Sequence, residues 1–291
     1  IKKISIEKSV NIVHAHTAHS HTLAVLGSFL GNNIPIVVSR RVDFPINNLL
    51  SGLKYNYKGT KKIICVSELI GKVITPQLKN PGRVITIYDG IDLQRCHRSD
   101  RNYLRREFLI SDEEYVIGNI AALAPHKDYL TFLEAAKLIA DAVPCRFLIV
   151  GEGKLRHQIE ARVNQLKLNK KVIMTGFRKD IERILPGFDV LLFTSEKEGL
   201  GSTVLDAMAC EVPVVATMAG GIPEIIKHEN TGMLANVKDA PQLAAYVLRL
   251  LKDMTFRNSI IKNAKQHVIY FSKEAMAEKT RKVYEEIICA K

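Results

Sequence analysis

The most informative stretch of the chain is Ser195-Glu196-Lys197-Glu198-Gly199-Leu200-Gly201-Ser202-Thr203-Val204-Leu205-Asp206, which follows the apolar run Val190-Leu191-Leu192-Phe193. The apolar run predicts a buried strand. The chain then turns at two glycines and opens a helix, a geometry that directs backbone N–H groups at an anion. Two acids, Glu198 and Asp206, flank the turn, and carboxylates accept hydrogen bonds from sugar or ribose hydroxyls. The stretch therefore predicts a ligand with phosphates and several hydroxyls, such as a nucleotide sugar.

Two further segments extend this pattern: Cys210-Glu211-Val212-Pro213-Val214-Val215-Ala216-Thr217 and Gly220-Gly221-Ile222-Pro223-Glu224. Together with the first stretch they resemble the donor-binding signature of retaining glycosyltransferases of family 4. That signature has two glutamates separated by seven residues; Glu198 matches the first, and Asp206 stands in place of the second. The resemblance runs from about Val10 to the C-terminus. An ordinary strand, turn and helix with surface acids is the alternative.

The resemblance implies an α/β fold of the GT-B type, in which two Rossmann-like, doubly wound domains face a cleft. Strand and helix candidates alternate along the chain, which also favours parallel sheets. Among them are strands over Cys145–Val150 and Val190–Phe193 and a helix over Ala240–Lys252. We expect an acceptor-side domain over residues 1–95 and a nucleotide-sugar donor domain over residues 113–272. A C-terminal helix over residues 273–291 is expected to pack back on the first domain. Family members carry further βα units before the segment Asn11–His16, so we expect the first domain to be incomplete in a truncated chain.

Composition limits the class of protein. The chain has 291 residues, of which 47% are hydrophobic and 25% charged, enough for two domains with cores of their own. No apolar run approaches the length of a membrane span, and no signal-peptide pattern is present. The cysteines are far apart and show no spacing typical of zinc or redox sites, which favours reduced thiols and a cytoplasmic location. They are Cys65, Cys96, Cys145, Cys210 and Cys289.

The net charge of +12 comes partly from clusters at Arg40-Arg41, Lys54–Lys62 and Arg95–Arg106. Such clusters suit nucleic acid, an anionic membrane surface or an acidic acceptor, although solvated surface charge explains most lysines. No nucleic-acid-binding motif accompanies them, so we favour a membrane surface or an anionic glycolipid and expect no nucleic-acid partner. A peripheral position on the inner membrane follows as a hypothesis.

Histidines stand at the end of the first strand candidate, Val10–His16, and in the loop before a helix candidate over Thr22–Leu30. His14 and His16 are two apart and share a strand face, and His19 and His21 follow in the loop. No acid or cysteine stands at a metal-ligand spacing nearby, so hydrogen-bonded histidines in a cleft wall are favoured over a metal site. By resemblance the loop faces the acceptor, which makes His16, His19 and His21 acceptor contacts. Arg41, after the second strand, is either a phosphate or carboxylate clamp or a surface arginine paired with Asp43.

Cations must neutralise the donor diphosphate. Lys127 matches the family's lysine, whereas Ala122 stands where relatives carry an arginine, and His126 or Arg178 are the candidates to replace that charge. Arg178 has a surface role as an equal alternative, and Glu224 either receives a sugar hydroxyl or favours its helix N-terminus. The donor-binding set implied by the resemblance is Gly199, Leu200, Gly201, Ser202, Thr203, Asp206, Gly176, Phe177, Arg178, His126, Gly220, Gly221 and Glu224.

The implied reaction is transfer of a sugar from a nucleotide-diphosphate sugar to an acceptor hydroxyl with retention, without metal or cofactor. Glu198 and Lys127 are its expected catalytic residues: Lys127 takes the phosphates with the amides of Gly199–Thr203, Glu198 the sugar hydroxyls, and Asp206 the ribose. The acceptor is a glycan or a lipid-linked sugar in bacterial cell-surface polysaccharide or lipopolysaccharide synthesis. A non-catalytic nucleotide-sugar-binding protein and a nucleotide-sugar epimerase of the same fold stay open. A phosphorylase is less favoured, since no motif for a pyridoxal phosphate lysine is present.

Overall fold

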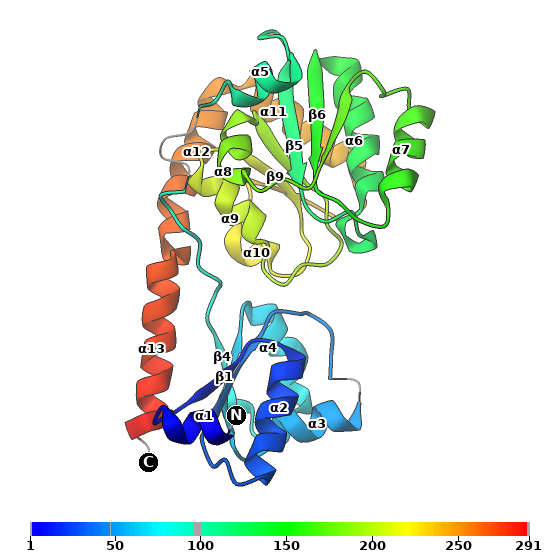
Figure 1. The fold of residues 1–291 in the computed structure, drawn as a ribbon. Coiled ribbons are helices and arrows are strands. Elements are labelled where there is room, and N and C mark those ends of the chain that lie inside the picture. The colour runs from blue at the N-terminus through cyan, green and yellow to red at the C-terminus, as the bar shows by residue number, and fades with distance from the viewer. Residues whose placement is uncertain (1, 47, 96–99, 290–291) are drawn as a thin grey trace. The chain divides into compact units, whose positions relative to one another are not determined.

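The computed structural model describes residues 2–46, 48–95 and 100–289. The chain divides into two compact units: unit 1 comprises residues 1–90 and 273–291, and unit 2 comprises residues 91–272. Each unit contains one parallel sheet covered by helices (Figure 1). The predicted α/β class with two parallel sheets is therefore confirmed.

Unit 1 is built on a four-stranded sheet in the order β1-β2-β3-β4, with every neighbouring pair parallel. The strands are β1 (Val13–Ala15), β2 (Ile36–Arg40), β3 (Thr60–Cys65) and β4 (Val84–Thr86). The helices are α1 (Lys2–Glu7), α2 (Ala18–Phe29), α3 (Leu49–Asn56), α4 (Glu68–Ile74) and α13 (Lys273–Cys289), with short 3-10 turns at Thr75–Gln77 and Pro81–Arg83.

The alternation of side chains along β2 assigns each face of this sheet. Because successive residues of a strand point to opposite faces, Val37 and Ser39 share one face while Ile36, Val38 and Arg40 share the other. Val37 packs in a buried cluster with Val283 and Ile287, so α13 covers the first face. The side chain of Arg40 reaches Tyr55 of α3, so α3 lies on the second face.

Capping side chains fix where the helices of unit 1 begin. Thr17 and Ser20 form a reciprocal capping box at the start of α2, and Gly31, at φ 86°, follows its end. Ser67 accepts a hydrogen bond from the N–H of Ile70 at the start of α4.

Unit 2 is built on a six-stranded parallel sheet in the order β10-β9-β8-β5-β6-β7. The strands are β5 (Tyr115–Ile120), β6 (Cys145–Val150), β7 (Val172–Gly176), β8 (Val190–Phe193), β9 (Val214–Thr217) and β10 (Met233–Ala235). The helices are α5 (Tyr103–Phe108), α6 (Tyr129–Ala142), α7 (Arg156–Gln165), α8 (Ile181–Ile184), α9 (Ser202–Ala209), α10 (Ile222–Ile225), α11 (Ala240–Lys252) and α12 (Met254–His267). Short 3-10 turns occupy Pro125–Lys127, Leu185–Gly187 and Val268–Phe271.

The core of unit 2 lies between the sheet and helices α6, α7 and α11. Phe132 of α6 and Phe147 of β6 are fully buried and meet edge to face at a ring-centroid distance of 6.2 Å. Helices α8 and α9 lie on the other side of the sheet (Figure 1). The ring of Phe188, which precedes β8, packs against β5 at Gly118, where a Cβ would lie 2.0 Å from that ring.

The strand order of unit 2 reverses between β5 and β8. After β5 the chain adds β6 and β7 on one side, and it then returns to add β8, β9 and β10 on the other. In doubly wound sheets, ligands bind outside the carboxyl ends of the strands at such a reversal. The loops after β5 and β8, which carry Lys127 and Glu198, therefore border the expected binding crevice of unit 2.

The cysteines differ in part from the sequence-based prediction. Cys65 and Cys145 are buried free thiols and Cys289 is an exposed one, whereas Cys210 is disulfide-bonded. The expectation of reduced thiols is corrected for Cys210. Cys96, with the rest of residues 96–99 of the predicted basic cluster, lies outside the described residues.

Candidate functional site

The turn between β8 and α9 presents unpaired backbone donors. Gly201 caps α9 at φ 99°, a left-handed conformation that favours glycine, and Ser202 is the first helical residue. Within the described part of the chain, the N–H groups of Gly199 to Thr203 make no hydrogen bond. These donors, with the positive end of the α9 dipole, can bind an anion.

Lys127 and Glu198 meet beside this turn. The ammonium group of Lys127 donates a hydrogen bond to Glu198 Oε1, and Ser195 Oγ donates to the same oxygen at 2.8 Å. The side chains of Lys127 and Glu198 are only 16% and 11% exposed. Lys127 Nζ also lies 5.4 Å from the centroid of the Phe193 ring. The pair is thus held in one place, at the edge of the reversal between β5 and β8.

Hydrogen bonds hold the two loops in register. Thr194 Oγ1 donates to the backbone oxygens of Lys127 (3.1 Å) and Asp128 (3.0 Å). The N–H of Glu196 donates to the backbone oxygen of His126 at 2.8 Å. The loop after β8 is therefore attached to the loop after β5 by main-chain and buried side-chain contacts, which positions Lys127 against Glu198.

The glycine pair after β9 closes against the same turn. Gly220 has φ 54°, and a Cβ there would lie 1.8 Å from the backbone oxygen of Glu198. The N–H of Gly221 donates to that oxygen at 3.2 Å. In this structure Gly220 and Gly221 therefore support Glu198 directly; their predicted contact with the donor stays a prediction.

Asp206 lies on α9 beside an arginine. Arg95 Nη1 is 3.4 Å from Asp206 Oδ2, and a second nitrogen of Arg95 is 3.8 Å from Glu182. Burial raises the pKa of Asp206, and the positive charge of Arg95 partly opposes this shift. The sequence placed Arg95 only within a basic cluster, so its pairing with Asp206 was not predicted.

The turn after β7 carries a further group of predicted donor residues. Gly176 has φ 73°, and its backbone oxygen accepts a hydrogen bond from the N–H of Gly151. Phe177 is 71% exposed. Arg178 contacts three side chains: Asp180 at 2.7 Å, Tyr103 at 2.9 Å and Glu107 at 2.5 Å.

Arg178 is held by charge-assisted hydrogen bonds to two acidic side chains. The hydrogen bonds that Arg178 donates to Asp180 and Glu107 raise the pKa of Arg178, and the same guanidinium lowers the pKa of Asp180. Such charge-assisted bonds are strong ones. Arg178 therefore joins α5 to the loop before α8, and a phosphate would have to displace these partners.

The other predicted donor residues are placed around the turn. His126 is exposed and follows β5 in the same loop as Lys127, and Glu224 is half-buried on α10. Ala122 is exposed, so no cation stands at that position.

Of the residues predicted for the acceptor, His16, His19 and Arg41 are exposed. Arg41 Nη1 donates to Asp89 Oδ2 at 2.8 Å, rather than to Asp43. The His14 and His16 rings lie 4.0 Å apart, and His14 contacts Tyr284 and Ser39 through its two ring nitrogens.

His21 lies elsewhere. Because the Thr17 cap starts α2 before it, His21 falls on the buried face of the helix, 0% exposed, with Nε2 3.2 Å from Thr60 Oγ1. Its expected acceptor contact is corrected on this ground, because a side chain with no exposed surface does not reach a ligand.

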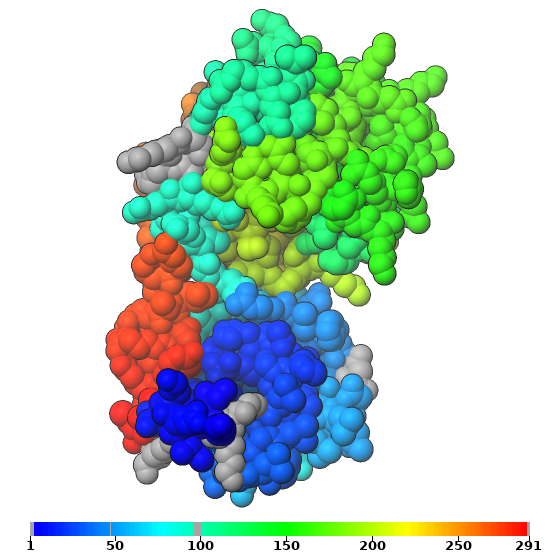
Figure 2. Space-filling model, in the orientation of Figure 1, coloured from blue at the N-terminus to red at the C-terminus, as the bar shows by residue number. Residues whose placement is uncertain are grey.

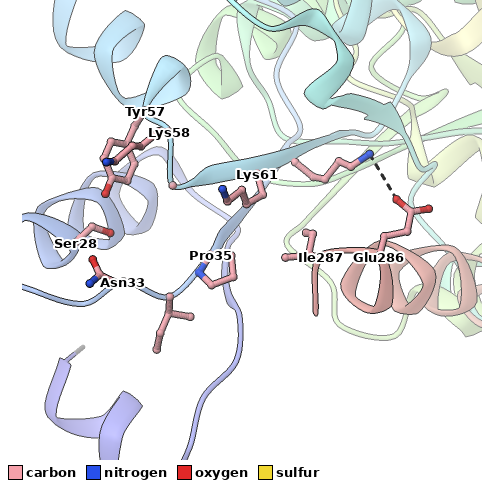
Figure 3. Close-up of a pocket in the computed structure, with 11 residues that line it drawn as sticks. Ser28, Asn33, Pro35, Tyr57, Lys58, Lys61, Glu286 and Ile287 are labelled. Carbon is pink, nitrogen blue, oxygen red and sulfur yellow. Dashed lines mark ion pairs between the residues drawn. The ribbon is translucent and has the colours of Figure 1, made fainter. Parts of the chain in front are cut away.

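Unit 1 also contains a cavity of about 580 Å³ at the amino-terminal ends of β2 and β3. Tyr57, Lys58 and Lys61 line it, together with Pro35 and Ile287 (Figure 3). Lys62 and Glu286 form an ion pair there, with a nitrogen–oxygen distance of 3.5 Å. Because ligands of doubly wound sheets bind at the carboxyl ends of the strands, this cavity is not the acceptor site expected from the sequence.

Among the described residues, no group of three or more histidine, cysteine or acidic side chains is arranged to hold a metal ion. No helix in the same part of the chain is both long and apolar enough to cross a membrane.

Comparison with known sequences identifies the family. The model of the family Glycosyl transferases group 1 matches residues 100–267, more than half of the chain. The chain belongs to this family. Residues 1–95 match the family Glycosyltransferase Family 4. The resemblance recognised from the sequence is therefore confirmed.

Related glycosyltransferases cover nearly the whole chain. N-acetyl-alpha-D-glucosaminyl L-malate synthase of Bacillus anthracis is 28% identical over 98% of this chain and 77% of its own length. The Escherichia coli enzyme UDP-Gal:alpha-D-GlcNAc-diphosphoundecaprenol alpha-1,3-galactosyltransferase is 25% identical over 99% of this chain and 79% of its own length.

Solved structures establish the fold of this glycosyltransferase. Anabaena Alr3699/HepE in complex with UDP and glucose superposes with a TM-score of 0.86 and 20% identity, over 98% of this chain and 80% of that one. Sucrose-phosphate synthase of Thermosynechococcus elongatus superposes with a TM-score of 0.84 and 19% identity, over 100% of this chain and 77% of that one. The predicted GT-B fold is thus confirmed.

Proposed function

We propose that this glycosyltransferase moves a sugar from a nucleotide-diphosphate sugar to an acceptor hydroxyl with retention of configuration and without a metal ion. The observation that carries the proposal is the pair Lys127 and Glu198, which lies at the strand-order reversal beside the unpaired N–H groups of Gly199 to Thr203. A cation, several amide donors and an acid side by side suit a ligand that has both phosphate and hydroxyl groups.

The proposed binding of the donor phosphates follows from the charge that they carry. The diphosphate of the donor gains negative charge as the sugar leaves, and fixed donors that require no rearrangement stabilise that charge. Lys127 and the amides before and at the start of α9 supply such donors. When a diphosphate binds, it competes with Glu198 for the ammonium group of Lys127, which frees the Glu198 carboxylate for sugar hydroxyls.

Asp206 is proposed to bind the ribose. Its carboxylate lies on α9, at the fifth residue of the helix, and Arg95 beside it favours the ionised form that accepts two hydroxyl hydrogen bonds. Gly176 and Phe177 are proposed to lie against the base. His126 is proposed to supply positive charge near Lys127, because Ala122 occupies the position where relatives carry an arginine.

The relatives support a nucleotide-sugar donor. The Anabaena protein was solved with UDP and with UDP-glucose, and the name of the Escherichia coli enzyme gives UDP-Gal as its donor. That enzyme and a Campylobacter jejuni relative that is 27% identical act, by their names, on diphosphoundecaprenol-linked sugars. We therefore propose a role in bacterial cell-surface polysaccharide or lipopolysaccharide synthesis, at the cytoplasmic face of the inner membrane.

The test is a panel of nucleotide-diphosphate sugars with the purified protein. Calorimetry measures donor binding, and chromatography measures nucleotide release and sugar products with and without lipid-linked and soluble glycan acceptors. We expect binding of one donor and acceptor-dependent release of its nucleotide. Donor binding with no transfer to any acceptor would favour a non-catalytic protein, and formation of an epimer without acceptor would favour an epimerase.

A further inference from the structure

Two adjoining cavities in unit 1 differ in character. One, of about 450 Å³, lies at the carboxyl ends of β1 and β2 and is lined by polar groups including His16, Arg40 and Arg41. The other, of about 680 Å³, lies between α2 and α3. Asn48, Ser51 and Lys54 line both cavities, so the two form one continuous hollow with a polar and an apolar end.

Arg41 pairs with Asp89, but the two other cations of the polar cavity, Arg40 and Lys54, have no carboxylate partner among the described residues. Arg40 is 6% exposed, donates to Tyr55 Oη at 2.9 Å and to the backbone oxygen of Phe44, and leaves its buried Nε without a partner. Lys54 Nζ donates to the backbone oxygen of Ala18 at 3.1 Å and to Thr22 Oγ1 at 3.2 Å.

The positive charges of Arg40 and Lys54 therefore have no negative partner at a place that is partly shielded from water. Burial and the nearby charge of Arg40 lower the pKa of Lys54. Among the described residues, no aspartate or glutamate lines either cavity. Charged groups out of water are costly unless they are paired, so this cavity favours an anionic ligand.

The apolar cavity is open at the surface. Leu26 and Phe29 of α2 are 52% and 72% exposed, and Leu50 and Leu53 of α3 are 78% and 61% exposed. Figure 2 shows both helices on the outer surface of unit 1, in blue and lighter blue. Contiguous apolar surface of this kind marks a binding site for an apolar ligand or partner.

We propose that this hollow binds a lipid-linked acceptor, with a phosphate or diphosphate head beside Arg40 and Lys54 and a single apolar chain between α2 and α3. The inference rests on the proposed glycosyl transfer and selects one acceptor class for it. His16 and Arg41, two of the residues predicted to contact the acceptor, line the polar cavity. The hollow therefore places the acceptor's head group beside them. A flat bilayer would contact the exposed leucines but would make no use of the buried Arg40.

The experiment measures binding of farnesyl phosphate by calorimetry, with farnesol and inorganic phosphate as the two half-ligands. Because head and chain bind at adjoining sites, farnesyl phosphate should bind at least about tenfold more tightly than either half. UDP and GDP are titrated into the same samples, so that failure of the donor site is seen separately.

Two variants with matched controls separate the two ends. Leu53→Ser should weaken farnesyl phosphate and farnesol alike, by about tenfold. Leu49→Ser, on the same helix and 80% exposed but outside both cavities, should leave both unchanged. Lys54→Met should weaken farnesyl phosphate by about tenfold and leave farnesol unchanged. Lys61→Met, which removes an exposed lysine outside both cavities, should change neither.

Three results would overturn the inference. The first is equal affinity for farnesyl phosphate and inorganic phosphate. The second is equal loss in Leu53→Ser and Leu49→Ser. The third is binding only to phosphatidylglycerol vesicles and not to farnesyl phosphate, which would indicate a bilayer surface instead. If UDP or GDP binds and farnesyl phosphate does not, this inference fails while the proposed donor site stands.

Discussion

Lys127 and Glu198 are 71 positions apart in the sequence, yet the lysine ammonium group donates a hydrogen bond to the glutamate carboxylate in a largely buried contact. Each follows one of the two strands between which the strand order of unit 2 reverses. The pair places a cation and an acid beside the turn between β8 and α9, where the backbone amides of Gly199 to Thr203 make no hydrogen bond within the described part of the chain. Its side chains are the most direct targets for variants.

Lys127→Met and Glu198→Gln should each lower kcat/KM for glycosyl transfer by about a hundredfold or more, because each removes a group that we propose to act on the donor in the transition state. The measurement is steady-state kinetics with circular dichroism as a check of folding. The neighbouring pair Lys238 and Glu196, joined at 3.2 Å and more exposed, gives matched controls. Lys238→Met and Glu196→Gln should keep near wild-type rates; if they lose as much activity as the first two variants, the assigned roles are wrong.

Gly220→Ala should remove transfer and lower the free energy of unfolding by about 1–3 kcal/mol. The new methyl group would lie 1.8 Å from the backbone oxygen of Glu198, so the turn carrying that residue must move. Gly52→Ala is the control: its Cβ has nothing within 4 Å, and inside α3 alanine should stabilise by roughly 0.5–1 kcal/mol. Urea unfolding measures both. Wild-type activity in Gly220→Ala would contradict the role of this close approach.

Asp206→Asn should weaken binding of a ribonucleoside diphosphate by about tenfold, because the amide accepts ribose hydroxyls less well than a carboxylate. The same variant should bind the 2′,3′-dideoxy form of that nucleotide as wild type does. Calorimetry with both ligands makes the comparison, and Glu211→Gln, which lies just beyond α9, controls for loss of negative charge. Equal losses for both nucleotides would place Asp206 away from the ribose.

Arg178→Met should lower the free energy of unfolding by about 1–3 kcal/mol, since it leaves the partly buried Asp180 and Glu107 without their common partner. Denaturant unfolding measures the loss. Donor affinity, measured below the unfolding range, should stay within about twofold of wild type. A large loss of donor affinity in a stably folded variant would instead support the phosphate contact predicted from the sequence.

His21 should contribute to acid sensitivity. Burial lowers the pKa of His21 from its ordinary 6.5 to about 4. Between these values the unfolded chain binds a proton that the folded chain does not, so stability is fully present above pH 6.5 and is lost as the pH falls toward 4. The full loss from this one group would be roughly 3 kcal/mol. Urea titrations at several pH values should show a smaller slope in His21→Gln and an unchanged slope in His19→Gln. An unchanged slope in both would contradict the assignment.

The sequence predicted the elements of unit 2 more closely than those of unit 1. Strands β6 and β8 and helix α11 have the predicted bounds, because uninterrupted apolar runs or a clear helical period define them. The first strand was predicted over Val10–His16 but covers only Val13–Ala15. The ends of β1 depend on which of its residues pair with β2, and the local sequence pattern does not specify this pairing.

The candidate site was predictable as a set of positions but not as a set of contacts. The spacing of residues along the chain predicted a strand, a glycine turn and a helix, with Glu198 before the turn and Asp206 on the helix. It did not predict that Arg95 pairs with Asp206 or that Arg178 pairs with Glu107, because these partners meet only through tertiary packing. His21 was misplaced because the helix was expected to begin at Thr22, whereas the Thr17 cap starts it at Ala18.

A crystal structure of the protein with a bound nucleoside diphosphate, chosen by the calorimetric panel, is the decisive test of the proposed donor site. We expect the diphosphate at the start of α9, with phosphate oxygens within hydrogen-bond reach of the amides of Gly199–Thr203 and of Lys127 Nζ. A nucleotide that binds at saturation with its diphosphate away from both groups would contradict it.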